Sequence, residues 1–226
     1  MTNLAEAIRR AGPLVAKRSP DLQAAAREVL LDAHLGTALA IAQGTWQQKG
    51  RVIPKWIARS EAIVTASGSP RVVRAMPNTP ALIGRGIAGL YAREAVTEAD
   101  RAQVQAVLAP IGSTLWVAQE RDLDAVTALS GSGPAYVFYF IEAMMQAGTE
   151  MGLEPAQARR LAQETFAGAA ALAAQSDEPP EVLRERVTSK GGTTYAALSS
   201  LEASGVKAAF VRALHAARDR AEELGR

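Results

Sequence analysis

The sequence contains no cysteine, and this absence excludes disulfide bonds, thiolate metal sites and cysteine nucleophiles together. Its only two histidines, His34 and His215, stand far apart, and neither has other ligand residues at metal-binding spacing. We therefore predict neither a metal site nor a catalytic triad built on histidine.

The sequence also lacks an apolar run long enough to span a membrane. Residues 1–6 do not form the apolar core of a secretory signal, so we expect a cytoplasmic protein with no membrane partner. The 226 residues, 48% apolar and 21% charged, are typical of a globular chain of one large or two small domains.

A DNA-binding motif and an aromatic platform for bases are missing as well. Positive residues outnumber negative ones in residues 1–74, and the reverse holds in residues 75–226. Because the positive residues are scattered, we predict no nucleic-acid partner.

Residues 1–70 contain little regular pattern. Residues 45–51 are polar and typical of a turn. The remaining predicted elements of this segment are two short helices at 4–11 and 22–31 and two short strands at 52–53 and 62–65.

A more regular pattern follows and indicates part of an α/β sheet. Pro77 and Pro80 stop the first strand and fix an extended loop at its C-terminal end, where ligands usually bind in open α/β sheets. Thr97 is placed to cap the helix of this part, with Asp100 as the acidic partner of a capping box. The predicted elements are strands at 71–76, 87–92 and 114–117 and a helix at 98–108.

From residue 120 onward the pattern is helical. The predicted helix at 135–151 is apolar on nearly every face, which is typical of a helix buried in a core or between subunits. We therefore expect a helical domain that forms a dimer. The other predicted helices are 122–129, 155–174, a short one ending at 186, 195–203 and 206–224.

The stretch from Val187 to Thr194 holds two adjacent glycines followed by two threonines, directly before a predicted helix. Glycines allow a ligand close to the main chain, and Thr193 or Thr194 can cap the helix. The unpaired N–H groups at a helix start favour a small anion such as a carboxylate or phosphate. A tight turn between helices that needs glycine is the alternative reading.

Three stretches resemble the pyrroline-5-carboxylate reductase family. Residues 71–80 (RVVRAMPNTP) are similar to the strand and loop that end its Rossmann part, and residues 128–136 (ALSGSGPAY) and 187–194 (VTSKGGTT) are similar to two signatures of its helical domain. The similarity runs from about residue 69 to the C-terminus.

The resemblance implies an α/β plus all-α fold: a Rossmann-like domain over 1–119, incomplete or degenerate before about residue 70, and a helical dimerisation and substrate-binding domain over 120–226. It implies NADPH or NADH as cofactor and a homodimer, which in this family is often assembled further into a decamer. The implied reaction is reduction of 1-pyrroline-5-carboxylate to L-proline, the last step of proline biosynthesis.

The resemblance also implies site residues. The substrate carboxylate would lie on the N–H groups of Gly192, Thr193 and Thr194, and the Thr194 hydroxyl is our candidate proton donor to the imine nitrogen. The remaining implied residues are Ser189, Gly191, Glu120 and Asp177 at the substrate, and Met76, Pro77 and Asn78 at the nicotinamide end of the cofactor.

The sequence departs from the family in residues 1–70, which lack the family's opening apolar strand and its G-x-G-x-x-(A/G) turn. We expect this region to be truncated and partly read out of frame; a diverged but folded cap is the alternative. Three functions follow: a pyrroline-5-carboxylate reductase, a non-catalytic oligomerisation module derived from that family, and a relative that reduces another cyclic imine or a 3-hydroxy acid.

Overall fold

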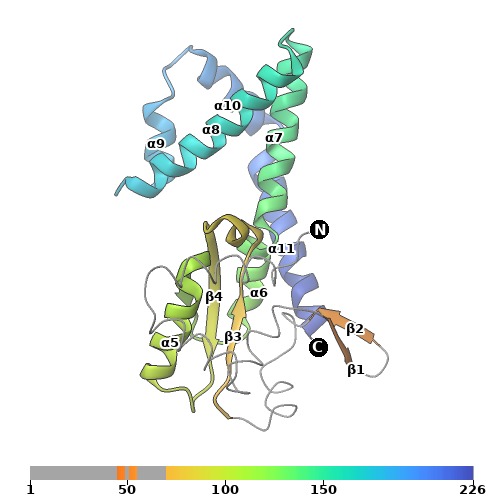
Figure 1. Ribbon diagram of the computed structural model, residues 1–226. Helices are drawn as coiled ribbons and strands as arrows, with labels where there is room; N and C mark the ends of the chain where they lie inside the picture. Colours follow the sequence, from red (N-terminus) through yellow and green to blue (C-terminus); the bar gives the residue numbers. More distant parts are fainter. Residues whose placement is uncertain (1–44, 49–50, 55–69, 226) are drawn as a thin grey trace. The chain divides into compact units, whose positions relative to one another are not determined.

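The computed structural model describes residues 45–48, 51–54 and 70–225 (Figure 1). The chain divides into two compact units. The sheet unit comprises residues 1–134 with 215–226, and the helical unit comprises residues 135–214. The predicted boundary between residues 119 and 120 stays a prediction.

A small antiparallel hairpin opens the described part of the chain. Strand β1, Thr45–Gln48, pairs with β2, Arg51–Pro54. The prediction of a turn over 45–51 was therefore wrong for β1, because an antiparallel ladder is made by main-chain groups that polar residues also carry. The strand predicted at 52–53 is confirmed as part of β2. The predicted elements at 4–11, 22–31 and 62–65 lie outside the described residues.

A three-stranded sheet in the order β3-β4-β5 forms the centre of the sheet unit. Strand β3 is antiparallel to β4, and β4 is parallel to β5 across the connecting helix α5. The predicted strands and helix of this part are thus confirmed. Their bounds are Val73–Met76 for β3, Gly86–Ala92 for β4, Glu98–Leu108 for α5 and Gly112–Trp116 for β5, with short 3₁₀ turns η2 at Thr79–Ile83 and η3 at Ala109–Ile111.

The two faces of this sheet contact different helices. Ala88 and Leu90 of β4 are buried in one apolar cluster with Val104 and Leu108 of α5. The intervening Gly89 faces the other way, where a Cβ would lie 2.7 Å from a methyl group of Val126 in the next helix.

The pairing register places Arg74 and Met76 of β3 on this second face, because Met76 is opposite Gly89. The helix that covers it, α6, spans Asp122–Val126 and continues as a π-helical turn η4 over Thr127–Gly131. The Ser132 N–H donates to the Thr127 carbonyl at 2.8 Å, the i→i+5 bond of such a turn.

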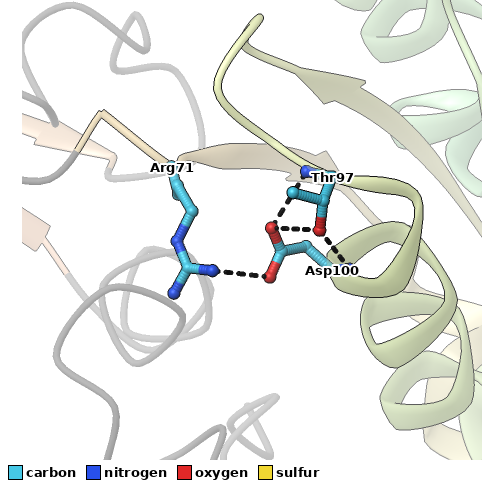
Figure 2. A network of polar contacts seen from close by, with 3 residues as sticks. All are labelled: Arg71, Thr97 and Asp100. Carbon is cyan, nitrogen blue, oxygen red and sulfur yellow. Dashed lines mark hydrogen bonds and ion pairs between the residues drawn. The ribbon is translucent and has the colours of Figure 1, made fainter.

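The start of α5 has the predicted capping box (Figure 2). The Asp100 carboxylate accepts hydrogen bonds from the Thr97 N–H and hydroxyl at 2.9 and 2.8 Å, and Arg71 donates to it at 3.2 Å. Burial raises the pKa of Asp100, but these hydrogen bonds and the Arg71 charge outweigh burial and leave the pKa below its usual value.

The helical unit is built from helices with short connections, and the last of them, α11, continues past residue 214 into the sheet unit. Helices α7 and α11 meet through aromatic rings, since Phe210 lies edge-on to Tyr136 and Phe140 at centroid distances of 5.6 and 5.7 Å. The helices lie close to their predicted bounds: α7 Gly133–Glu150, α8 Pro155–Gln175, α9 Pro180–Arg186, α10 Thr193–Ala203 and α11 Val206–Gly225.

Burial in the helical unit is sparse. Only Gly148, Ala158 and Ala162 are buried among residues 135–214, and all three are small. A Cβ on Gly148 would lie 2.9 Å from the Ala158 methyl group, so α7 and α8 touch closely there. Within the described residues, no helix is long and apolar enough to cross a membrane.

Candidate functional site

The loop after β3 carries the predicted cofactor residues Met76, Pro77 and Asn78. Met76 is buried, and its methyl end lies against Gly131, where a Cβ would come within 2.4 Å of it. A side chain at position 131 would therefore have to displace the end of the Met76 side chain. This contact joins two of the family-like stretches, which the sequence alone showed only as separate motifs.

Asn78 makes a second connection between these stretches. Its side-chain amide nitrogen donates to the Ser130 hydroxyl at 3.2 Å, and its side-chain oxygen accepts from the Ile87 N–H at 3.0 Å. The Asn78 carbonyl also accepts from the Ala81 N–H at 3.2 Å. Asn78 thus holds the loop against the start of β4 and the end of η4.

The loop after β3 does not lie at the edge of the sheet that the sequence predicted for it. The rule that ligands bind at the carboxyl ends of strands concerns parallel sheets. Because β3 is antiparallel to β4, its C-terminal end lies at the edge where β4 and β5 begin. Among the described strands, the loop is therefore not at a shared carboxyl edge.

Glu120, predicted at the substrate, lies in the sheet unit and pairs with Arg74. The Arg74 Nη1 donates to a Glu120 carboxylate oxygen at 3.3 Å, and Arg74 is only 2% exposed. A buried guanidinium needs such a partner because desolvation of a lone charge is costly. The pair ties β3 to the segment before α6, and sequence reasoning missed it. The signal was a lone arginine inside an apolar strand.

The loop from Ser189 to Gly192 leads into α10 in the helical unit. Gly191 has φ +75°, which favours glycine. Gly192 has extended dihedrals and is the N-cap residue, and a Cβ on it would lie 2.6 Å from the Ser189 hydroxyl oxygen. The two glycines therefore serve different needs, one dihedral and one steric.

The predicted capping by Thr193 or Thr194 was wrong, since both residues lie inside α10 and no side chain caps the helix. The Gly192 N–H, predicted to bind the substrate carboxylate, donates instead to the Ser189 carbonyl at 3.0 Å. The first intrahelical bond is from the Ala196 N–H to the Gly192 carbonyl at 3.1 Å. The N–H groups at the start of α10, those of Thr193 and Thr194 among them, precede this bond and can receive an anion.

Asp177, the last predicted substrate residue, is exposed between α8 and α9. The side chain of its neighbour Glu178 forms an ion pair with Arg186, and the Glu178 main-chain N–H donates to the Ser176 hydroxyl at 3.1 Å. The structure thus places Ser189, Gly191 and Gly192 in the loop before α10 and Thr193 and Thr194 in its first turn. Asp177 belongs to the same unit and Glu120 to the other.

Neither half of the described chain shows the usual phosphate loop of dinucleotide folds. The sequence has one G-x-G-x-x-G string, from Gly84 to Gly89, but it runs into strand β4 rather than into a helix. A phosphate loop needs the helix start that follows the glycines. Within the described residues, no group of three His, Asp or Glu side chains is placed to hold a metal ion.

Comparison with known proteins gives consistent matches. Residues 120–224 match the family described as pyrroline-5-carboxylate reductase dimerisation. The pyrroline-5-carboxylate reductase of Pseudomonas aeruginosa is 49% identical over 158 residues, which is 70% of this chain and 58% of the relative. That of Corynebacterium melassecola is 46% identical over 162 residues, 72% of this chain and 60% of the relative.

Solved structures agree. A pyrroline-5-carboxylate reductase from Coxiella burnetii superimposes with a TM-score of 0.72 at 38% identity, covering 75% of this chain and 63% of that one. The Plasmodium falciparum pyrroline carboxylate reductase with NADP bound gives 0.69 at 32% identity, with coverages of 75% and 68%. The chain thus spans 58% and 60% of the length of the two curated relatives above.

Proposed function

Because this chain belongs to the pyrroline-5-carboxylate reductase family, we propose that it reduces 1-pyrroline-5-carboxylate to L-proline with NADPH or NADH. The observation that carries the proposal is the match of residues 120–224 to the family's dimerisation domain, which includes the loop before α10. That loop offers main-chain N–H groups to a carboxylate, the one charged group that substrate and product share.

In this proposal the substrate carboxylate lies on the N–H groups of Thr193 and Thr194, with Ser189 and Gly191 shaping the loop. Thr194 is half-buried at the second helical position, and its hydroxyl delivers the proton to the imine nitrogen. The nicotinamide, when bound, supplies the hydride for the imine carbon. Asp177 and Glu120 remain proposed substrate residues.

The described residues fit only the nicotinamide end of a cofactor. The loop of Met76, Pro77 and Asn78 is firmly held, and both ends of the Asn78 amide are engaged within the protein. This loop therefore offers main-chain groups rather than the Asn78 side chain. A glycine turn for the pyrophosphate is absent from residues 70–225.

We also propose a homodimer formed through the helical unit, with assembly into a decamer as a further possibility. Apolar side chains of α7 that a monomer leaves exposed support the dimer, among them Phe138 at 59% and Tyr139 at 68% exposure. Location in the cytoplasm stays a prediction.

A non-catalytic module is the second candidate function. The missing phosphate loop favours it, because a chain that cannot dock NADPH keeps only the dimer and the carboxylate site. NADPH affinity separates the two candidates, and a panel of cyclic imino acids and 3-hydroxy acids tests whether another substrate is reduced.

The test is calorimetric titration of the purified chain with NADPH and NADH, followed by an assay with 1-pyrroline-5-carboxylate. We expect binding and turnover. Thr194→Val, which keeps the main-chain N–H but removes the hydroxyl, should lower kcat by roughly a hundredfold without changing NADPH affinity. Thr194→Ser should restore kcat. No cofactor binding by the wild type would contradict the reductase and leave the non-catalytic module.

A further inference from the structure

The loop that follows β3 is held by contacts to a segment far away in the sequence. Asn78 and Ser130 are 52 residues apart, yet the Asn78 amide donates to the Ser130 hydroxyl at 3.2 Å. The same Asn78 side chain accepts from the Ile87 N–H at 3.0 Å. Both functional ends of one planar amide are therefore fixed by two different elements.

The segment that contains Ser130 is held by hydrogen bonds of its own. Ser130 lies in the π-helical turn η4, closed by the bond from the Ser132 N–H to the Thr127 carbonyl. The Thr127 hydroxyl in turn donates to the Leu123 carbonyl at 2.7 Å. Single π-helical turns are rare and frequently occur at functional sites.

The Met76 contact with Gly131 lies directly beside this hydrogen bond. A residue larger than glycine at 131 would displace the Met76 methyl group, because the built Cβ lies only 2.4 Å from it. The loop is thus fixed at its first residue by packing and at its third by hydrogen bonds. Such double support is what an active-site loop needs to keep a reacting group in place.

We propose that Asn78 and Ser130 are positioning residues, a strut that sets the loop of Met76, Pro77 and Asn78 for the nicotinamide. The inference rests on the proposed reductase function. Neither side chain needs to touch the cofactor, because the Asn78 amide is already engaged on both sides within the protein. The strut acts through the loop's main chain.

If Asn78 and Ser130 act as one strut, removing either side chain should weaken NADPH binding. Ser130→Ala removes one hydrogen bond and should raise the Kd for NADPH by roughly fivefold. Asn78→Ala also removes the acceptor of the Ile87 N–H and should raise this Kd further. The KM for 1-pyrroline-5-carboxylate should stay unchanged, since its proposed site lies in the helical unit. The double variant should be no worse than Asn78→Ala alone, because the bond can be lost only once.

A raised Kd for NADPH distinguishes a positioning role of these residues from a role in folding stability alone. Simple destabilisation lowers the folded fraction and hence the apparent kcat, but it leaves the Kd of the folded fraction unchanged. Ser130→Thr keeps the hydroxyl and should restore NADPH affinity. Ser113→Ala, an exposed residue of β5, is the matched control and should behave as the wild type.

The experiment is NADPH titration and steady-state kinetics on these variants, with urea unfolding of each. Additive effects on NADPH affinity, or loss in Asn78→Ala with a silent Ser130→Ala, would overturn the strut, because the effect of Asn78 would then not depend on Ser130. A wild type without NADPH binding or turnover would contradict the proposed function instead. In that case the unfolding midpoints decide whether the two ends are coupled, and additive midpoint shifts would overturn the strut.

Discussion

The sheet unit and the helical unit differ in how much apolar surface each buries by itself. The sheet unit surrounds Leu90 and Leu123, both 0% exposed, with further apolar side chains. In residues 135–214 the buried positions are a glycine and two alanines, while Phe138, Tyr139 and Met151 are exposed. The sheet unit thus has an apolar core of its own, whereas the exposed apolar side chains of the helices need another surface to cover them.

The most severe test of the sheet's own core is Gly112→Ala. Gly112 has φ +142°, and a Cβ there would lie 1.9 Å from the Gly86 carbonyl oxygen, where β4 and β5 begin side by side. We expect a loss of more than about 4 kcal/mol in the free energy of unfolding. Urea unfolding followed by tryptophan fluorescence measures it, because all three tryptophans lie in residues 1–134.

Ser113→Ala, the exposed neighbour in β5, serves as the control and should change the free energy of unfolding by less than about 0.5 kcal/mol. A Gly112→Ala variant as stable as this control would show that the close approach of the two strands is not needed for the core.

A charge placed on the helical unit tests whether its exposed apolar side chains are covered by a second copy of the chain. Phe138→Asp puts a carboxylate into the proposed interface, and the cost of burying an unpaired charge is several kcal/mol. We expect the dimer to dissociate, as seen by size-exclusion chromatography at matched concentrations. Ile83→Asp, at a site 76% exposed in the sheet unit, is the matched control and should stay dimeric. Equal dimer populations in both variants would remove the distinction between the units.

Breaking the ion pair between Arg74 and Glu120 in the sheet unit should cost somewhat less. Arg74→Met leaves Glu120 without its guanidinium, and we expect a loss of about 3 kcal/mol in the free energy of unfolding. The double variant Arg74→Met with Glu120→Gln should recover part of it, because the carboxylate charge that the guanidinium balanced is then removed as well. If Glu120→Gln alone impairs turnover while unfolding is unchanged, Glu120 acts on the substrate rather than on the fold.

The smallest effect concerns the start of α5. Asp100→Asn removes the carboxylate that Thr97 and Arg71 bind, and should cost about 1 kcal/mol at neutral pH (Figure 2). Folding lowers the pKa of Asp100. The carboxylate therefore contributes fully to the free energy of unfolding above the pKa that Asp100 has in the unfolded chain, and this contribution is lost as pH falls through its pKa in the folded protein.

Urea unfolding of the wild type and of Asp100→Asn, from neutral pH to below about pH 4, checks this pH dependence, because an aspartate in an unfolded chain titrates near pH 4. The difference between wild type and Asp100→Asn should shrink as the solution becomes acidic. A difference that grows toward low pH would contradict the assignment.

Local signals predicted most of the helices, and non-local contacts account for what was missed. Thr97 and Asp100 placed the start of α5 because both partners of a capping box lie within four residues. The antiparallel pairing of β3 with β4 could not be predicted, since strand direction depends on which edges meet.

In the candidate site, too, local features were predicted from the sequence and long-range contacts were not. The loop before α10 was visible as a glycine pair, but the bond from Gly192 to Ser189 depends on how the turn closes. The contacts of Asn78 with Ser130 and of Arg74 with Glu120 span 52 and 46 residues, and no sequence period connects such positions. These long-range contacts appear only once the sheet and α6 are in place.

Sedimentation equilibrium of the full chain over a range of concentrations tests most directly the claim that the helical unit depends on a second copy. We expect a mass of at least twice the 23.8 kDa of one chain at every concentration where the helices remain folded. A folded monomer of 23.8 kDa, with its α7 side chains still exposed, would contradict it.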